Sequence, residues 1–435
     1  MIPQKISIHW FRRDLRLFDN CALYHALDSG LRVMPIFIFD TDILSLLSDT
    51  SDLRVNFIHR EVYQMNNNLR ALGSSLHQYV GRPEEIFKLL VASFDIDSVY
   101  ANSDYEPYGI ARDNQVARFL ASKGVEFNTF KDHVIFEKSE IVKPDSLPYT
   151  VFTPYSKKWT EKFMQRMPET FSTETLVNNF QQCQPVTGLS IEQIGFKQVD
   201  FLFPSPVPDE EIIRDYQKYR DIPSLNRTSH LGLHLRFGTV SIRQLARLAY
   251  QLNATWLNEL IWREFFMQIL FHFPYVQKSA FKSQYDRIEW LNDETDFNNW
   301  CEGKTGYPLV DAGMHELNHT GFMHNRVRMV TASFLTKHLL IDWRWGEAYF
   351  AEKLLDFELS SNNGNWQWAA GTGCDAAPYF RIFSPQAQTD RFDRKLEYIR
   401  RWVPESGTGQ YPEPIIEHGF ARKRCLAAYR KALNK

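Results

Sequence analysis

The sequence is poor in cysteine and lacks any long apolar run. Its cysteines form no CxxC pair, so neither a disulfide framework nor a cysteine zinc site is supported; they are Cys21, Cys183, Cys301, Cys374 and Cys425. The longest apolar run, residues 33–39, is much shorter than the roughly 18 residues of a membrane-spanning helix. Residues 1–16 hold no apolar core of signal-peptide length. We therefore expect a cytoplasmic protein with no membrane partner.

Charges are balanced overall but unevenly distributed. The 435 residues carry 50 Lys and Arg against 52 Asp and Glu, and 44% are hydrophobic, which fits a globular chain of two or three domains and excludes compositional disorder. From Arg381 to Lys435 there are 12 basic and 6 acidic residues, which leaves 38 basic and 46 acidic ones elsewhere. A basic end on an acidic body is either an anion-binding face or a solvated helical surface.

Short apolar runs alternate with helical patterns over residues 1–135. Runs rich in β-branched residues predict strands at 5–11, 32–39, 76–80, 98–102 and 125–130. Caps and helical periods predict helices at 20–30, 52–72, 83–94 and 110–123. This alternation predicts an α/β domain with a parallel, Rossmann-like sheet. No GxGxxG follows the first strand, so the usual dinucleotide fingerprint is missing.

Beyond residue 135 the pattern changes twice. Eight prolines interrupt residues 136–208, which predicts a long surface connector. Helical periods then dominate, at 210–218, 242–252, 256–271, 309–317, 326–340 and 345–354. We therefore expect a second, all-α domain over residues 209–435.

Tryptophan is concentrated in this second part, which holds nine of the eleven, from Trp256 onward. Core packing explains most of them. Trp366 and Trp368 differ, because the segment 362–368 is rich in Asn and Gly and predicts a turn. These two indoles serve either as core or as a wall on which a flat ring stacks.

Two short motifs imitate known sites. The H-E-x-x-H at 315–319 would place two imidazoles on one helix face, as in zinc peptidases, but His324 comes one residue too early for the extended motif. We weigh zinc against histidines that cap or flank a helix end near Gly321. The Gly-Lys-Thr at 303–305 resembles the end of a P-loop, but Asn298 stands where its first glycine should be, so we discard it.

Seven ordered segments resemble the photolyase–cryptochrome family, most closely its class I cyclobutane pyrimidine dimer photolyases. They are F-R-R-D-L-R at 11–16, R-T-S-H-L-G at 227–232, N-E-L-I-W-R-E-F at 258–265, G-K-T-G-Y-P at 303–308, M-H-N-R-V-R-M at 323–329, N-N-G-N-W-Q-W at 362–368 and D-A-A-P-Y-F-R-I-F at 375–383. The matches are collinear and cover nearly the whole chain. The resemblance also speaks against zinc, because the family holds no metal at residues 315–319.

The resemblance implies a fold, a reaction and a cofactor. The α/β domain and connector would precede a helical domain that binds FAD and DNA. Excited, fully reduced anionic FAD would donate an electron to a cyclobutane dimer, the ring would split, and the electron would return. The enzyme would be a deoxyribodipyrimidine photo-lyase, a carbon–carbon lyase that acts on UV-damaged DNA at the nucleoid; we expect a monomer with no obligate protein partner.

A second, light-harvesting chromophore is left open. Residues 105–109 differ from the Asn-Glu that binds a folate antenna in some relatives. A folate, a deazaflavin, a flavin or no antenna are all compatible with the sequence.

By position in the motifs, the resemblance implies a set of FAD-binding residues. Hydroxyls and backbone N–H groups at a helix start would hold phosphates and ribityl. An ion pair of Arg328 with Asp356 would lie over the flavin edge, and Asn362 would face flavin N5. Gly232 stands where the family usually has Ser, so one phosphate hydroxyl is lost. The full set is Tyr216, Thr228, Ser229, His230, Leu231, Gly232, Trp256, Arg263, Arg328, Asp356, Glu358 and Asn362.

The resemblance also implies residues for substrate and electrons. Glu259 would hydrogen-bond the dimer as charge develops, and Trp262 and Trp368 would stack on the flipped bases. The catalytic set is Glu259, Asn325, Met329 and Asn362, and the DNA-binding set is Arg220, Glu259, Trp262, Asn325, Arg326, Trp368, Gln388 and Arg391. Trp290, Trp343 and Trp366 occupy the family's electron-hopping chain; simple packing is the alternative for each.

Two other functions remain to be compared with repair. A cryptochrome-like flavoprotein would bind a signalling partner and repair nothing, but Asn362 and Trp368 favour repair. A zinc hydrolase at His315 and His319 would carry stoichiometric metal without flavin.

Overall fold

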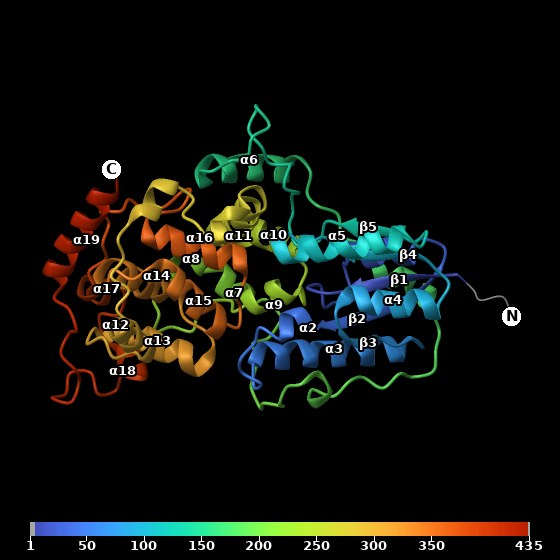
Figure 1. The fold of residues 1–435 in the computed structure, drawn as a ribbon, viewed down its shortest axis with the longest axis horizontal. Coiled ribbons are helices and arrows are strands. Elements are labelled where there is room, and N and C mark those ends of the chain that lie inside the picture. Colours follow the sequence, from blue (N-terminus) through green and yellow to red (C-terminus); the bar gives the residue numbers. More distant parts are fainter. Residues whose placement is uncertain (1–4, 434–435) are drawn as a thin grey trace. The chain divides into compact units, whose positions relative to one another are not determined.

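The computed structural model describes residues 5–433, which divide into two compact units (Figure 1). The first, here the α/β unit, comprises residues up to 141, 159–208 and 230–251. The second, the helical unit, comprises residues 142–158, 209–229 and 252 onward. Each unit therefore takes residues from several separate parts of the chain.

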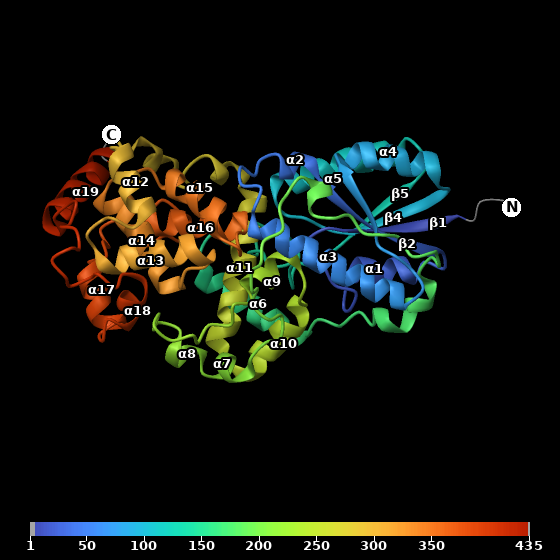
Figure 2. The same ribbon diagram turned by 90° about the horizontal axis from the view of Figure 1, so that it is seen from below.

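The α/β unit is built on a five-stranded parallel sheet in the order β3-β2-β1-β4-β5. The strands are β1 (Ile6–Phe11), β2 (Arg32–Asp40), β3 (His77–Gly81), β4 (Ile96–Asn102) and β5 (Glu126–Phe130). Figure 2 shows helices on both faces, α1 (Cys21–Leu27) and α3 (Leu53–Ala71) on one, α4 (Pro83–Ser93) and α5 (Pro107–Ala121) on the other. The predicted parallel α/β fold is confirmed.

Local signals account for these elements. β1 is buried along its whole length, as a central parallel strand requires. The side chains of Asn20 and Asp52 accept from backbone N–H groups at the starts of α1 and α3. Pro83 and Pro107 begin α4 and α5, where a missing N–H has no cost. Of the α-helices before residue 209, two were not predicted: the short α2 (Thr41–Leu44), and α6 (Phe152–Gln165), which lies within the proline-interrupted segment.

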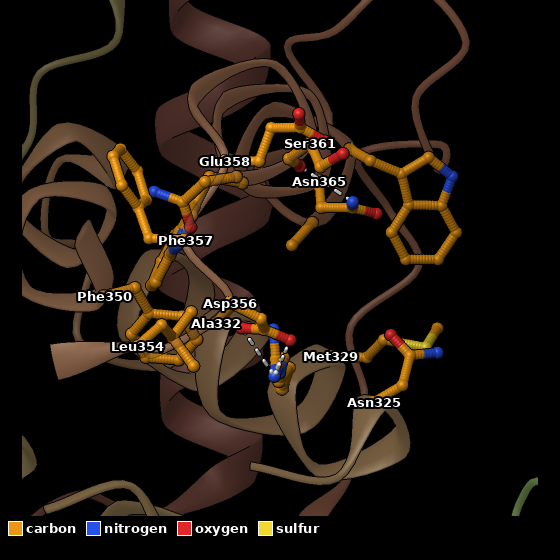
Figure 3. Close-up of a pocket in the computed structure, with 15 residues that line it drawn as sticks. Asn325, Met329, Ala332, Phe350, Leu354, Asp356, Phe357, Glu358, Ser361 and Asn365 are labelled. Carbon is orange, nitrogen blue, oxygen red and sulfur yellow. Dashed lines mark hydrogen bonds and ion pairs between the residues drawn. The ribbon is translucent and has the colours of Figure 1, made fainter. Parts of the chain in front are cut away.

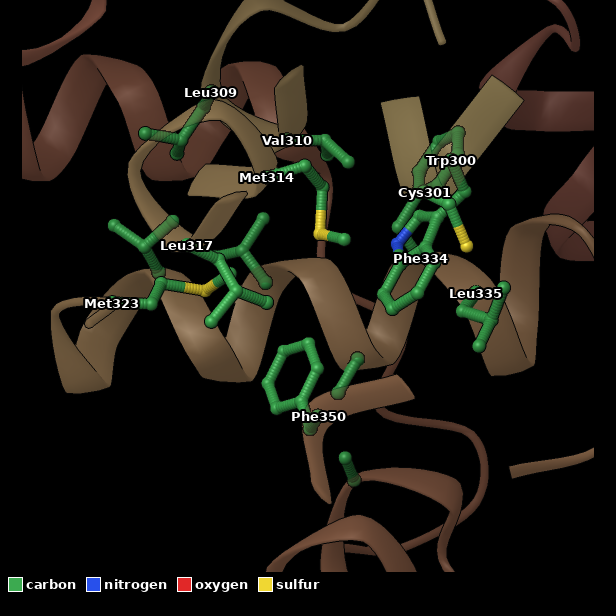
Figure 4. Packing of buried hydrophobic residues seen from close by; sticks show 14 of the residues in the cluster. Trp300, Cys301, Leu309, Val310, Met314, Leu317, Met323, Phe334, Leu335 and Phe350 are labelled. Carbon is green, nitrogen blue, oxygen red and sulfur yellow. The ribbon is translucent and has the colours of Figure 1, made fainter. Parts of the chain in front are cut away.

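The remaining helices begin after residue 209, and the predicted all-α character of this part is confirmed. They are α7 (Glu210–Arg214), α8 (Tyr216–Tyr219), α9 (Gly232–Phe237), α10 (Ile242–Leu252), α11 (Ala254–His272), α12 (Glu294–Glu302), α13 (Pro308–Thr320), α14 (Asn325–Ser333), α15 (Trp343–Lys353), α16 (Leu359–Ala370), α17 (Pro385–Phe392), α18 (Glu397–Trp402) and α19 (His418–Leu433). Figure 4 shows the core of the helical unit, where Trp300, Met314 and Phe350 are buried. Within residues 5–433 no helix is both long and apolar enough to cross a membrane.

The predicted turn at 362–368 is wrong, because this segment lies inside α16. Its weak helix formers are held by tertiary contacts instead of propensity. The side-chain amides of Asn363 and Gln367 both donate to the backbone O of Val276, at 3.0 Å each. Gly364 lies so close to Phe266 that a Cβ would overlap the phenyl ring.

The predicted helix at 326–340 is helical as far as residue 338, but its second half is not an α-helix. α14 ends at Ser333, and a π-helical turn, Phe334–His338, follows. This turn places Lys337 and His338 in the interior. Lys337 Nζ donates to the backbone O of Arg381 (2.9 Å), and burial lowers the pKa of the amine to about 8.

Candidate active site

A pocket in the helical unit gathers many of the residues that the motifs single out (Figure 3). Its walls come from α14, α15, the turn at 354–358 and α16, and they surround a cavity of about 100 Å³ that is partly open to solvent. The predicted residues in the wall are Asn325, Arg328, Met329, Asp356, Glu358, Asn362, Trp366 and Trp368. Sequence reasoning missed the rest of the wall, namely Ala332, Phe350, Leu354, Phe357, Ser361, Asn365 and Ala369.

Two arginine–carboxylate pairs border this pocket. Arg328 Nη2 lies 3.0 Å and 3.2 Å from the two carboxylate oxygens of Asp356. Arg328 Nε also donates to the backbone O of Met323 (2.7 Å), which fixes the guanidinium plane. Arg263 contacts Glu358 through Nε (3.1 Å) and Nη2 (3.3 Å), with side-chain exposures of 11% and 6%. The Arg263–Glu358 pair uses two nitrogens and two oxygens, and such bidentate pairs hold their geometry better than single contacts.

The amide of Asn362 has a fixed orientation. Its Nδ2 donates to the backbone O of Glu347 (3.0 Å) and to Oε1 of the same residue (3.2 Å). A backbone carbonyl can only accept, so the nitrogen must face Glu347 and Oδ1 remains as the free acceptor. No partner for this Oδ1 lies among the described residues. The pocket therefore offers a hydrogen-bond acceptor at Asn362.

Glu347 was not among the residues predicted from the sequence. Burial raises the pKa of its carboxyl to about 7, and the hydrogen bond from Asn362 only partly opposes this. Strongly shifted carboxyls cluster at functional sites. Glu347 stands out only because it lies on α15 opposite Asn362, and this proximity can be seen only in the tertiary structure.

The predicted electron-transfer tryptophans have different surroundings. Trp366 is buried and meets Phe350 (5.0 Å between centroids) and Trp300 (6.1 Å) edge-on. Trp343 is buried with the guanidinium of Arg344 over its ring at 4.8 Å. Trp290 meets Tyr429 edge-on at 6.1 Å. Trp300, in contact with Trp366, was not singled out by any sequence motif.

A chain of contacts links several predicted DNA-binding residues. Glu259 on α11 accepts from Arg220 Nη1 (2.5 Å), and Asp221 accepts from Arg326 Nη2 (2.7 Å). Burial raises the pKa of the Glu259 carboxyl, and Arg220 opposes this rise. Asp221, next to Arg220, was not predicted, and it joins the two pairs.

Phe392 extends this chain and was likewise not predicted. The guanidinium of Arg326 lies 4.3 Å, and that of Arg391 5.0 Å, from the centroid of its ring. Gln388, one turn earlier on α17, has a buried Oε1 without a hydrogen-bond partner among the described residues. Predicted contacts with DNA backbone thus come from α8, α14 and α17.

The remaining predicted FAD residues lie outside the wall of this pocket. Trp256 is buried on α11, and the guanidinium of Arg220 lies 5.1 Å from the ring centroid of Tyr216. The loop from Thr228 to Leu231 precedes α9, which begins at Gly232, so a helix start is present where the motif predicts one. His230 adopts a left-handed backbone conformation (φ 52°).

The zinc interpretation of H-E-x-x-H has no geometric support. Both ring nitrogens of His315 contact backbone carbonyls, of Trp402 (2.8 Å) and of Glu302 (3.2 Å), and a nitrogen that donates to a carbonyl has no lone pair for a metal. Glu316 accepts from the hydroxyl of Tyr398 (2.6 Å). Among residues 5–433 no group of three or more His, Cys, Asp or Glu could hold a metal ion.

The parallel sheet of the α/β unit and the helices of the helical unit match the fold of photolyases and cryptochromes. The family profile described as the FAD binding domain of DNA photolyase matches residues 256–409, and the profile described as DNA photolyase matches residues 7–172. The chain belongs to the DNA photolyase family.

Individual relatives are similar to this chain over nearly its full length. The deoxyribodipyrimidine photo-lyase of Escherichia coli is 37% identical, covering 97% of this chain and 98% of its own. A class III photolyase structure from Agrobacterium tumefaciens superposes with a TM-score of 0.87 at 31% identity, covering 100% and 99% of the two chains. The photolyase of Sulfolobus tokodaii, described with two FAD molecules and a novel light-harvesting cofactor, gives a TM-score of 0.79 at 32% identity over 98% and 99%.

Proposed function

We propose that this protein is a light-dependent DNA repair enzyme that binds FAD and splits cyclobutane pyrimidine dimers. The observation that carries this proposal is the pocket in which Asn362, Met329, Trp366 and Trp368 border one opening, within a chain of the DNA photolyase family. Relatives that match nearly the whole chain are named deoxyribodipyrimidine photo-lyase.

The lining of the pocket suits a flavin in its chemistry. Apolar and aromatic groups supply flat walls, and the Arg328–Asp356 pair supplies charge at the edge. When bound and reduced, FAD supplies an electron donor that light activates. Asn362 then presents Oδ1 as an acceptor for a protonated ring nitrogen, because its Nδ2 is already used by Glu347. The Arg263–Glu358 pair adds a further polar contact while remaining neutral overall.

Predicted residues outside the pocket wall contact the other parts of FAD. Hydroxyls and backbone N–H groups of Tyr216 and residues 228–232 hold phosphates and ribityl, and Trp256 packs against the cofactor. Gly232 contributes only its backbone N–H.

The substrate residues act on the flipped dimer. Trp262 and Trp368 stack on its bases, Asn325 and Met329 line the same space, and Glu259 donates a proton or hydrogen bond as negative charge develops. Burial raises the pKa of the Glu259 carboxyl while Arg220 opposes the rise, so this group lies in a partly desolvated position. Arg220, Arg326, Arg391 and Gln388 hold the flanking DNA backbone.

Trp290, Trp343 and Trp366 would pass an electron from an external reductant, such as a thiol, to bound oxidised flavin in the light. Several finer expectations stay predictions: class I membership, a deazaflavin, folate or other antenna, a monomer, a location in the cytoplasm at the nucleoid, and domain boundaries at residues 135 and 208.

The decisive experiment is a repair assay. Flavin-loaded, chemically reduced protein is mixed with an oligonucleotide that carries one thymine cyclobutane dimer, and dimers are counted after blue light and after darkness. Loss of dimers only in the light supports repair. No loss in either condition, from protein that retains flavin, would contradict it and would favour a signalling flavoprotein.

A further inference from the structure

The indole of Trp262 is stacked on the ring of Phe152. Their centroids are 3.5 Å apart and their planes differ by 5°, so the two rings are in van der Waals contact face to face. Phe152 comes from the start of α6 and Trp262 from α11, and both belong to the helical unit. Phe152 is buried and Trp262 is half-buried. One face of Trp262 is therefore covered by the protein itself.

Phe152 is held by contacts that do not involve Trp262. Its backbone N–H donates to Oδ2 of Asp375 (2.9 Å). In the next turn of α6, the hydroxyl of Tyr155 donates to Oε1 of Glu264 (3.4 Å). Phe265 and Phe266 also pack against Trp262, with 5.6 Å and 5.4 Å between ring centroids, but Phe152 makes the closest and most nearly parallel contact. Phe152 thus fixes the plane of the indole.

We infer that Phe152 is a positioning residue for dimer recognition, which covers one face of Trp262 and presents the opposite face to the flipped base. This inference rests on the proposed function, in which Trp262 is a stacking surface. An indole that is free to change rotamer must be immobilised when a base stacks on it, and this lowers affinity. Because the stack on Phe152 already immobilises the indole in the free protein, this loss of affinity does not arise on binding. Asp375 acts one step further away, through the backbone of Phe152.

The test compares flavin-loaded wild type, Phe152→Leu and Phe152→Tyr in the dark. The dissociation constant is measured for an oligonucleotide with one thymine cyclobutane dimer and for the same strand without it. Leucine keeps the apolar character and loses the flat surface, whereas tyrosine keeps the ring. We expect Phe152→Leu to weaken dimer binding about three- to tenfold, with binding of the undamaged strand unchanged, and tyrosine to restore wild-type affinity.

Two further measurements separate positioning from a general loss of structure. Near-UV circular dichroism, read against Trp262→Phe, should lose the stacked-indole signal in Phe152→Leu and keep it in Phe152→Tyr. Phe420→Leu, a change of an exposed ring on α19, is the matched control and should alter neither affinity nor dichroism. Asp375→Ala, which removes an anchor and touches neither ring, should weaken dimer binding in the same direction even if Phe152→Leu does not fold.

Each outcome decides the inference. Unchanged dimer affinity in Phe152→Leu, or in Asp375→Ala where the first variant does not fold, would overturn it. Tighter binding would also overturn it, because the phenyl ring would then occupy the face that the dimer needs. If wild type shows no preference for the dimer strand, the proposed function fails and the role of Phe152 fails with it. Since wild type is measured first, the two failures are distinguishable.

Discussion

Charged groups are arranged differently at the carboxyl edge of the sheet and around the pocket of the helical unit. Beyond the ends of β1 and β5, Asp132 accepts from Arg16 Nη2 (2.7 Å) and Arg243 Nη2 (2.8 Å), and all three side chains are buried. At the pocket, Oδ1 of Asn362 has no partner among the described residues, and the carboxyl of Glu347 faces an amide instead of a cation. In the first arrangement each charge has a partner of opposite sign, whereas the second leaves an acceptor, Oδ1 of Asn362, for a ligand.

The most disruptive test of this comparison is Asp132→Ala. Burial disfavours the ionised carboxyl, but Arg16 and Arg243 outweigh it and lower the pKa of Asp132. Removing the carboxylate leaves the buried Arg16 without its counter-ion, whereas Arg243 keeps its pair with Asp19, so we expect a loss of about 3–5 kcal/mol in the free energy of unfolding. Urea titration followed by circular dichroism measures it. Asp97→Ala, which breaks the exposed pair with Lys5, is the control and should cost at most about 1 kcal/mol; equal losses would contradict the structural role.

Glu347→Gln tests the pocket of the helical unit through the pH dependence of the free energy of unfolding. The pKa of this carboxyl is raised from 4.5 to about 7, so between these values the native state holds a proton that the unfolded state has released. Stability therefore falls as pH rises through this window, by on the order of 2–3 kcal/mol in total. Glutamine does not titrate, so the variant should lack this fall when flavin-free protein is unfolded at pH 5 and pH 8. Glu352→Gln, exposed on the same helix, should keep it.

Trp262→Ala should act on binding and not on folding. Loss of a stacking surface costs about 1–3 kcal/mol for each base, so affinity for dimer-containing DNA should fall about 5- to 150-fold. Fluorescence anisotropy with a labelled strand measures this, with the undamaged strand as control. Equal losses for both strands would show that Trp262 contacts DNA without recognising damage.

Trp290→Phe should have the smallest effect on repair. If Trp290 carries electrons from the surface, the change should slow photoreduction of oxidised flavin severalfold in the presence of a thiol, while pre-reduced enzyme repairs normally. Trp300→Phe provides the comparison, because Trp300 touches Trp366. A slower reaction in Trp300→Phe alone would move the route to that residue.

The fold could be predicted from the sequence largely because local signals and packing agree in the α/β unit. Asn20 and Asp52 cap the helices that their positions predict, and β1 is as buried as its apolar run requires. The prediction failed at 362–368, where turn-forming residues are helical because Asn363 and Gln367 bind Val276, far away in the sequence. Motifs with fixed spacing could be recognised in the sequence without the structure.

Parts of the site were not accessible from the sequence for the same reason. Glu347 and Trp300 lie in no motif, and their importance comes from one neighbour each, Asn362 and Trp366. Phe152 lies in a segment that the prolines made appear to be a loop, although it begins a helix. When the role of a side chain depends on a partner from another helix, no periodic pattern in the sequence indicates that role.

The contact between Gly364 and Phe266 restricts how this enzyme can evolve. Every other amino acid carries a Cβ, and a Cβ at position 364 would overlap the phenyl ring. Phe266 is itself buried and packs against Trp262, with 5.4 Å between the ring centroids, so it has little room to yield. A lineage can therefore replace Gly364 only after, or together with, a smaller residue at position 266. We expect the two positions to covary among homologues, so that neither one drifts alone.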